Sequence, residues 1–173
     1  FIQPRYQGKR SLDYLWYGIG AYLYQHPEIR YMVGPVSLST SLPESAQKVI
    51  AGFYTGLFGK DELLAKPRLP FDFEQVEDFV PFKKVADEIE YKQAYTILKE
   101  RMDELGVKVP VLYKQYVELC QPGGCEFLGF NIDPTFSNCV DALILVHIDT
   151  IKEKKNQRYI ESHAVVMQSL NSA

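Results

Sequence analysis

Residues 30–39, "RYMVGPVSLS", decide how the surrounding sequence is interpreted, because they combine a strand-like apolar run with a Gly34-Pro35 pair. Proline cannot donate a backbone hydrogen bond to a sheet, so we predict a strand with a bulge or a split at this pair. Ser37 and Ser39 follow, and the two-residue period of a strand predicts that their side chains share one face. This strand is therefore the first place to look for a site.

The segments around this strand predict helices. Residues 11–25 have apolar side chains at three- and four-residue spacing, with Ser11 as the expected N-cap and Asp13 in the first turn. Residues 43–59 repeat the spacing, begin with a proline and end with a glycine suited to a C-cap. Residues 1–6 are strand-like. Strand, helix, strand and helix thus follow one another.

The rest of the chain continues this alternation. Residues 60–82 contain three prolines and four phenylalanines without a period, which indicates a long connection within the domain. Beyond it we predict helices over 83–105 and 110–120, strands over 125–132 and 142–148, and a helical tail from Lys152. The sequence therefore predicts an α/β fold with a mixed sheet flanked by helices.

Composition excludes several classes of function. The 173 residues suit one domain, and a net charge of −3 argues against a nucleic-acid-binding protein. The three cysteines Cys120, Cys125 and Cys139 fit buried, reduced thiols, and they lack the second pair that a structural zinc site needs. We therefore expect no metal. No apolar run reaches the ~20 residues of a membrane span, and we expect a cytoplasmic protein.

The start of the first helix has the features of a phosphate site. A helix N-terminus exposes unpaired N–H groups, and Gln7, Gly8, Lys9, Arg10 and Ser11 add a close backbone approach and positive charge. The alternative is that Lys9 and Arg10 are only a solvated pair. The glycine patterns of P-loop and dinucleotide-binding proteins are absent.

Three stretches of sequence carry a family resemblance. The run 7–12 resembles the pyrophosphate-binding turn of the GNAT acyltransferase superfamily, although Arg10 and Leu12 replace small residues there. The other two stretches resemble the hemolysin-like branch, which includes ornithine-lipid N-acyltransferases and is related to acyl-homoserine-lactone synthases. They are carried by Trp16, Gly18, Ile19, Gly34, Pro35, Val36, Ser37 and Ser39, and by Pro110, Tyr116, Asp133, Pro134, Phe136 and Asp141.

The resemblance implies an enzyme of lipid metabolism. It would transfer a fatty acyl group directly from acyl-CoA, or from the phosphopantetheine of acyl carrier protein, to an amine of a small or lipid acceptor. It also implies one GNAT-like domain over 1–173, whose first residues would lie inside the fourth strand of that fold. On this interpretation the N-terminal strands are absent and the chain is a fragment of a longer protein.

The resemblance also suggests roles for single residues. Residues 7–11 would hold the phosphate groups of the donor, and Tyr31, Val33, Gly34 and Val36 would line its arm. Tyr54 would protonate the leaving thiolate or, alternatively, would only pack. Ser37 and Ser39 would bond the substrate or the start of the next helix. Asp133 and Asp141 would bind the acceptor amine or, alternatively, only shape a turn. His147 fits a buried strand histidine better than a base.

Two other functions stay open at this point. In the first, the chain is a non-catalytic module that binds acyl thioesters or docks a partner domain of a larger lipid acyltransferase. The expected partners are a fused glycerolipid acyltransferase domain or a second copy of the chain in a homodimer. A peripheral site at the inner membrane would use the phenylalanines of 68–82, although four acidic residues there would be repelled by anionic lipid.

Overall fold

The computed structural model describes residues 3–6, 10–60, 64–73 and 88–164. Its contacts divide the chain into two compact units, which we describe separately. One unit comprises Phe1–Arg30 and Ile151–Ala173, and the other comprises Tyr31–Thr150.

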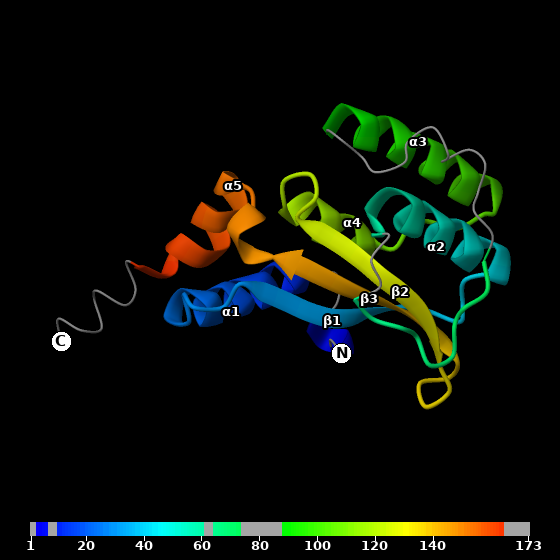
Figure 1. The fold of residues 1–173 in the computed structure, drawn as a ribbon, viewed down its shortest axis with the longest axis horizontal. Helices are drawn as coiled ribbons and strands as arrows, with labels where there is room; N and C mark the ends of the chain where they lie inside the picture. The colour runs from blue at the N-terminus through cyan, green and yellow to red at the C-terminus, as the bar shows by residue number, and fades with distance from the viewer. Residues whose placement is uncertain (1–2, 7–9, 61–63, 74–87, 165–173) are drawn as a thin grey trace. The chain divides into compact units, whose positions relative to one another are not determined.

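The unit 31–150 contains a three-stranded antiparallel sheet (Figure 1). Its strands are β1 (Tyr31–Leu38), β2 (Cys125–Asp133) and β3 (Cys139–His147), in the order β1-β3-β2. The expected split at Gly34-Pro35 is wrong, because both residues keep an unshifted register with β3. The proline is tolerated because β1 is an edge strand, where its missing N–H costs no ladder bond. The register shift lies in β2 instead, between Phe127 and Gly129.

Three helices of this unit lie on the same side of the sheet in Figure 1: α2 (Glu44–Phe58), α3 (Glu88–Glu104) and α4 (Val111–Leu119). Their ends confirm the predicted helix signals, since Gly59 is the C-cap of α2 and Pro110 is the N-cap of α4. The mixed α/β arrangement, an antiparallel sheet flanked by helices, is consistent with part of a GNAT-like fold.

The core lies between the sheet and these helices. The rings of Tyr54 and Tyr113 lie 4.6 and 5.8 Å from the ring of Phe127 on β2. The largest fully buried side chains are Tyr54, Tyr113, Phe53, Leu38, Ile50, Leu98, Met102, Val140, Val146 and Cys120. Because side chains alternate along a strand, Asp141 and Leu143 of β3 point to the opposite face of the sheet.

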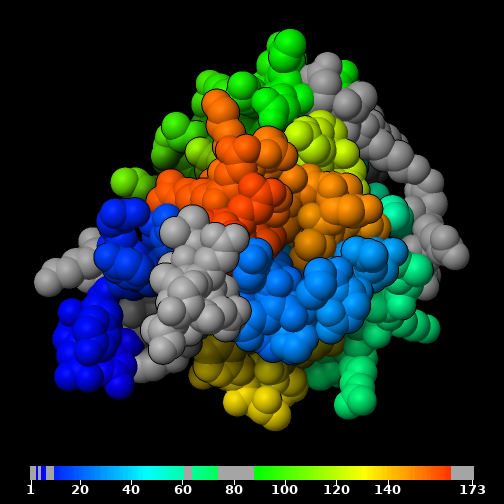
Figure 2. Space-filling view, turned by 90° about the vertical axis from the view of Figure 1, so that its left-hand side faces the viewer, coloured from blue at the N-terminus to red at the C-terminus, as the bar shows by residue number. Residues whose placement is uncertain are grey.

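A segment of the long connection lies along the outer edge of β2. Leu69 and Phe71 exchange backbone hydrogen bonds with Ile132 and Phe130, at 2.8 and 3.1 Å. At the other edge of the sheet, one face of β1 is exposed, whereas Val36 and Leu38 on its other face are buried. Figure 2 shows the surface of β1 in light blue above the β2–β3 turn in yellow. The described part of 60–82 is therefore ordered against the sheet.

The second unit contains η1 (Pro4–Tyr6), α1 (Ser11–Gln25), α5 (Glu153–Asn156) and η4 (Gln157–Glu161), the last a π-helical turn. The predicted strand over 1–6 is wrong for residues 4–6, which form a 3₁₀ turn. Gly20 of α1 faces the backbone carbonyl of Tyr159, with no room for a Cβ atom. A glycine thus permits close packing of η4 on α1.

Two further expectations concern the whole sequence. Cys120, Cys125 and Cys139 are buried and free of disulfide bonds, as expected. Within the residues described, the helices are too short or too polar to cross a lipid bilayer.

Candidate functional site

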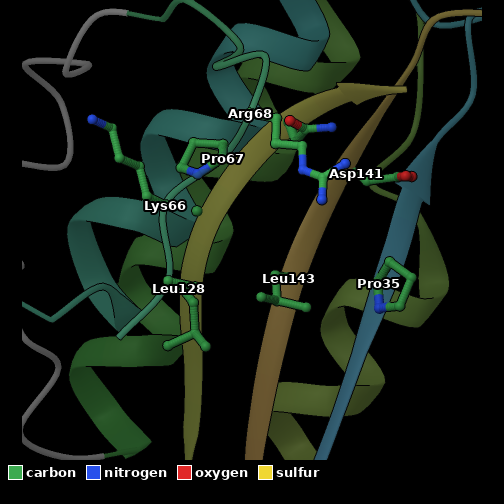
Figure 3. A pocket seen from close by; sticks show the side chains of 10 residues that line it. Pro35, Lys66, Pro67, Arg68, Leu128, Asp141 and Leu143 are labelled. Atoms are coloured by element: carbon green, nitrogen blue, oxygen red, sulfur yellow. The ribbon is translucent and has the colours of Figure 1, made fainter. Parts of the chain in front are cut away.

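A cavity of about 280 Å³ opens on the face of the sheet opposite to the helices (Figure 3). Its floor consists of residues from all three strands, and one wall is the segment that follows the edge of β2. The lining residues are Pro35, Ala65, Lys66, Pro67, Arg68, Leu128, Gly129, Asn131, Asp141 and Leu143. All of them belong to the unit 31–150, so that unit alone forms the cavity.

The strand register places three polar side chains in one row across the sheet. Asp141 of β3 lies opposite Ser37 of β1 on one side and Asn131 of β2 on the other. The Ser37 hydroxyl donates a hydrogen bond of 2.5 Å to Oδ1 of Asp141, and the Cys139 thiol is 3.4 Å from the same oxygen. Both donors are neutral. Asp141 therefore brings a negative charge to the cavity, held in position by Ser37.

The wall formed by the segment along the edge of β2 brings positive charge. Arg68 is exposed, and in Figure 3 its guanidinium extends across the cavity toward β3, whereas the Lys66 ammonium points away. The backbone N–H of Leu69 donates to Asn131 Oδ1 at 2.8 Å, which fixes the chain next to Arg68. Among the described residues, neither Arg68 nor Asp141 forms an ion pair. The cavity thus has a negative charge on its floor and a positive charge on one wall, with the apolar side chains of Pro35, Leu128 and Leu143 beside them.

Several residues predicted for the site lie elsewhere. Ser39 follows the end of β1, and its hydroxyl bonds the Ser41 hydroxyl at 2.8 Å, so it shapes the loop before α2. Asp133 accepts hydrogen bonds from the N–H and hydroxyl of Thr135, which lower its pKa and shape the β2–β3 turn. For both residues, the structural alternative fits the contacts seen.

The residues expected to line the donor's arm divide between the two faces of β1. Tyr31 and Val33 are 56% and 61% exposed on the open face. Val36 is buried against the helices, and its carbonyl accepts a hydrogen bond from the Tyr113 hydroxyl at 3.0 Å. The side chain of Val36 is therefore not available to a ligand. Gly34 lies mid-strand opposite Ile144.

Tyr54 has no exposed surface. Its ring packs among Phe53, Tyr113 and Phe127, and burial raises the pKa of its hydroxyl well above the usual range. The hydroxyl oxygen is buried and has no hydrogen-bond partner among the residues described. A proton donor must reach its acceptor, so this environment does not support the acid role; it fits the packing alternative.

The predicted phosphate site lies in the other unit and is only partly described. Gln7, Gly8 and Lys9 lie outside the described residues. Arg10 is the N-cap residue of α1, while Ser11, the expected cap, is the first helical residue and donates to the Tyr6 carbonyl.

The first turn of α1 also contains a carboxylate, that of Asp13. Asp13 forms an ion pair with Arg10 at 2.7 Å, and it also accepts hydrogen bonds from Arg158 and the Tyr159 hydroxyl. These contacts, that with Arg10 above all, lower the pKa of Asp13 to about 2. The guanidinium of Arg10 is thus already engaged by a carboxylate of the protein, that of Asp13, which is shared between Arg10 and Arg158. This contact does not favour Arg10 as a ligand for phosphate.

One polar cluster was not predicted from the sequence. Glu126 is 2% exposed, and its Oε1 lies 2.6 Å from both Lys60 Nζ and His147 Nε2. The ring of His147 also packs against Tyr31 at 5.0 Å. His147 is thus a satisfied strand histidine, as expected. It lies six residues along β3 from Asp141, about 20 Å at the rise of a strand, and is separate from the cavity.

Of the residues grouped at this cavity, Ser37 and Asp141 were among those predicted for a site, whereas Arg68 and Asn131 were not. The only signal for Arg68 was its position in a long connection, where binding residues are frequent. Asn131 lies in a predicted strand, and no motif marks it. Its role depends on the pairing of β2 with the segment before residue 74, which local spacing does not reveal.

Comparisons with known proteins show similarity to acyltransferases. The chain is 27% identical over 169 residues to a glycine N(alpha)-acyltransferase of Phocaeicola vulgatus and 28% identical over 174 residues to one of Bacteroides thetaiotaomicron. Each match covers 94% of this chain, but the chain spans only about half of each relative, 51% and 50%. No family model matches the chain, and no solved structure matches it. The chain is thus similar to about half of two proteins that are named as N-acyltransferases.

Proposed function

We propose that this chain is the acceptor-binding part of an N-acyltransferase that moves a fatty acyl group from a thioester to an amine. The single observation that carries the proposal is the hydrogen-bonded Ser37–Asp141 pair at the cavity. Both residues belong to the stretches that resemble the hemolysin-like branch of the GNAT superfamily, and two relatives are named as N-acyltransferases.

The chemistry of the reaction requires a group such as Asp141. An amine acceptor is protonated at neutral pH, and it must lose a proton before its nitrogen can attack the thioester carbonyl. We infer that Asp141 accepts a hydrogen bond from the ammonium group and takes its proton, while Ser37 orients the carboxylate. The C–N bond then forms as the C–S bond breaks; the attacking nitrogen gives up its second proton and the leaving thiolate takes up one, so that an amide and a free thiol result.

We also propose which molecules serve as donor and acceptor. The donor is a thioester of coenzyme A or of acyl carrier protein. The names of the relatives make glycine the first acceptor to test. We also propose that the protein acts in the cytoplasm, at the periphery of the inner membrane, where fatty acyl products collect.

Amine-dependent release of thiol tests the proposed function. The natural-length protein is incubated with palmitoyl-CoA and glycine, free thiol is followed by a colorimetric reagent, and the acylated amine is identified by mass spectrometry. We expect thiol release that depends on the amine and an amide product. Tight binding of acyl-CoA without any amide would contradict the proposal and favour a non-catalytic acyl-thioester-binding module.

A further inference from the structure

The cavity beside Asp141 also has the charges that a zwitterion needs. Asp141 lies on the floor of the cavity and Arg68 on one wall, and among the described residues neither is neutralised by an ion pair. A simple amine would use only Asp141. A molecule that carries an ammonium and a carboxylate group on neighbouring atoms would use both.

We propose that Arg68 binds the carboxylate of the acceptor, which makes the acceptor an amino acid and not a simple amine. The inference rests on the proposed function and specifies its acceptor. A guanidinium group presents paired N–H donors that match the two oxygens of a carboxylate. With the carboxylate held by Arg68, the ammonium group of the same small molecule points toward Asp141.

The structure also explains how Arg68 is kept in place. The chain around it is bonded to β2 through Leu69 N–H to Asn131 Oδ1 and through Ile132 N–H to the Leu69 carbonyl, each at 2.8 Å. The neighbouring Pro67 also restricts the backbone. The side chain of Arg68 is exposed, but the backbone that carries it is held in place. Little backbone ordering is therefore needed when a ligand binds to its guanidinium group.

The size of the cavity fits a small acceptor. Pro35, Leu128 and Leu143 give its floor an apolar surface. A volume of about 280 Å³ is near the lower end of the range for small-molecule sites. An amino acid with a small side chain fits into such a space.

Paired acceptors test this inference. Glycine and glycinamide share the amine, but glycinamide lacks the carboxylate. We expect kcat/KM for glycine to exceed that for glycinamide by at least about tenfold, because a site built for a charged group rejects the analogue that lacks it. In Arg68→Ala this preference should fall to within about threefold, mainly through a higher KM for glycine.

Lys66→Ala is the matched control, since it removes the same charge from the same segment but its ammonium points away from the cavity (Figure 3). It should keep the preference for glycine. Equal use of both acceptors by the unchanged protein would overturn this inference and leave the proposed function intact. Calorimetric titration of glycine gives a second measurement without turnover: binding that Arg68→Ala leaves unchanged would also overturn it.

Discussion

Tyr54 is a residue whose environment decides between two roles. Its hydroxyl is fully buried without a partner among the described residues, and an unpaired buried hydroxyl lowers the stability of the fold. We expect Tyr54→Phe to leave acyl transfer unchanged and to raise the free energy of unfolding by up to about 1 kcal/mol. Chemical denaturation and a thiol-release assay measure the two effects.

A large fall in turnover of Tyr54→Phe, with stability unchanged, would instead restore the acid role and require that the cluster around Tyr54 open. Tyr113→Phe is a suitable comparison, because Tyr113 lies in the same aromatic cluster but donates a hydrogen bond to the Val36 carbonyl. That variant should lose about 1 kcal/mol of stability.

Asp13 makes the stability of its unit depend on pH. Hydrogen bonding to Arg10, together with Tyr159 and Arg158, lowers the pKa of this carboxyl from its ordinary value of 3.8 to about 2. A lowered pKa means that the folded state favours the charged form. The resulting stabilisation is complete above about pH 4 and is lost as the pH falls through about 2.

The effect is measurable as the thermal midpoint between pH 5 and pH 2. The unchanged protein should lose stability steeply over this interval, and Asp13→Asn should show a shallower loss because its amide does not titrate. Identical slopes for the two proteins would show that the contacts of Asp13 add nothing to folding.

The packing of η4 on α1 depends on one glycine. A Cβ atom on Gly20 would overlap the Tyr159 carbonyl, whereas a Cβ atom on Gly18 would meet nothing within 4 Å. We expect Gly20→Ala to cost about 1–3 kcal/mol of unfolding free energy, and Gly18→Ala to gain up to about 1 kcal/mol from better helix propensity. Urea denaturation of both variants measures their free energies of unfolding and so separates the packing effect from helix propensity. Equal changes in the two variants would contradict the close approach of Gly20 to the Tyr159 carbonyl.

Most elements were predictable because their signals are local. Periodic apolar positions and the proline and glycine at helix ends gave α2 and α4 nearly to the residue. The split expected at Pro35 was wrong because a proline is also tolerated in an edge strand, and edge position depends on the whole sheet. The bulge in β2, at Phe127/Gly129, includes a glycine, which is a common local marker of a bulge but was not used in the strand prediction.

Across the whole molecule, the candidate site arises from pairing between distant segments. Ser37 and Asp141 are 104 residues apart in sequence, and the antiparallel register of β1 and β3 brings them together. A motif marked each residue separately, but no spacing predicted their contact. Arg68 reaches the same cavity only because its segment pairs with β2. Single candidate residues could thus be predicted from the sequence, whereas their arrangement in one cavity depends on the fold.

The decisive measurement compares two aspartates that sequence analysis could not separate. Asp141→Asn and Asp133→Asn make the same chemical change, but Asp141 lines the cavity and Asp133 shapes a turn that asparagine also favours. Amine-dependent thiol release should fall at least about 100-fold in Asp141→Asn, a loss typical of a missing proton acceptor, and less than about threefold in Asp133→Asn. Equal activities for the two variants, with both folded by circular dichroism, would contradict an acceptor site at this cavity.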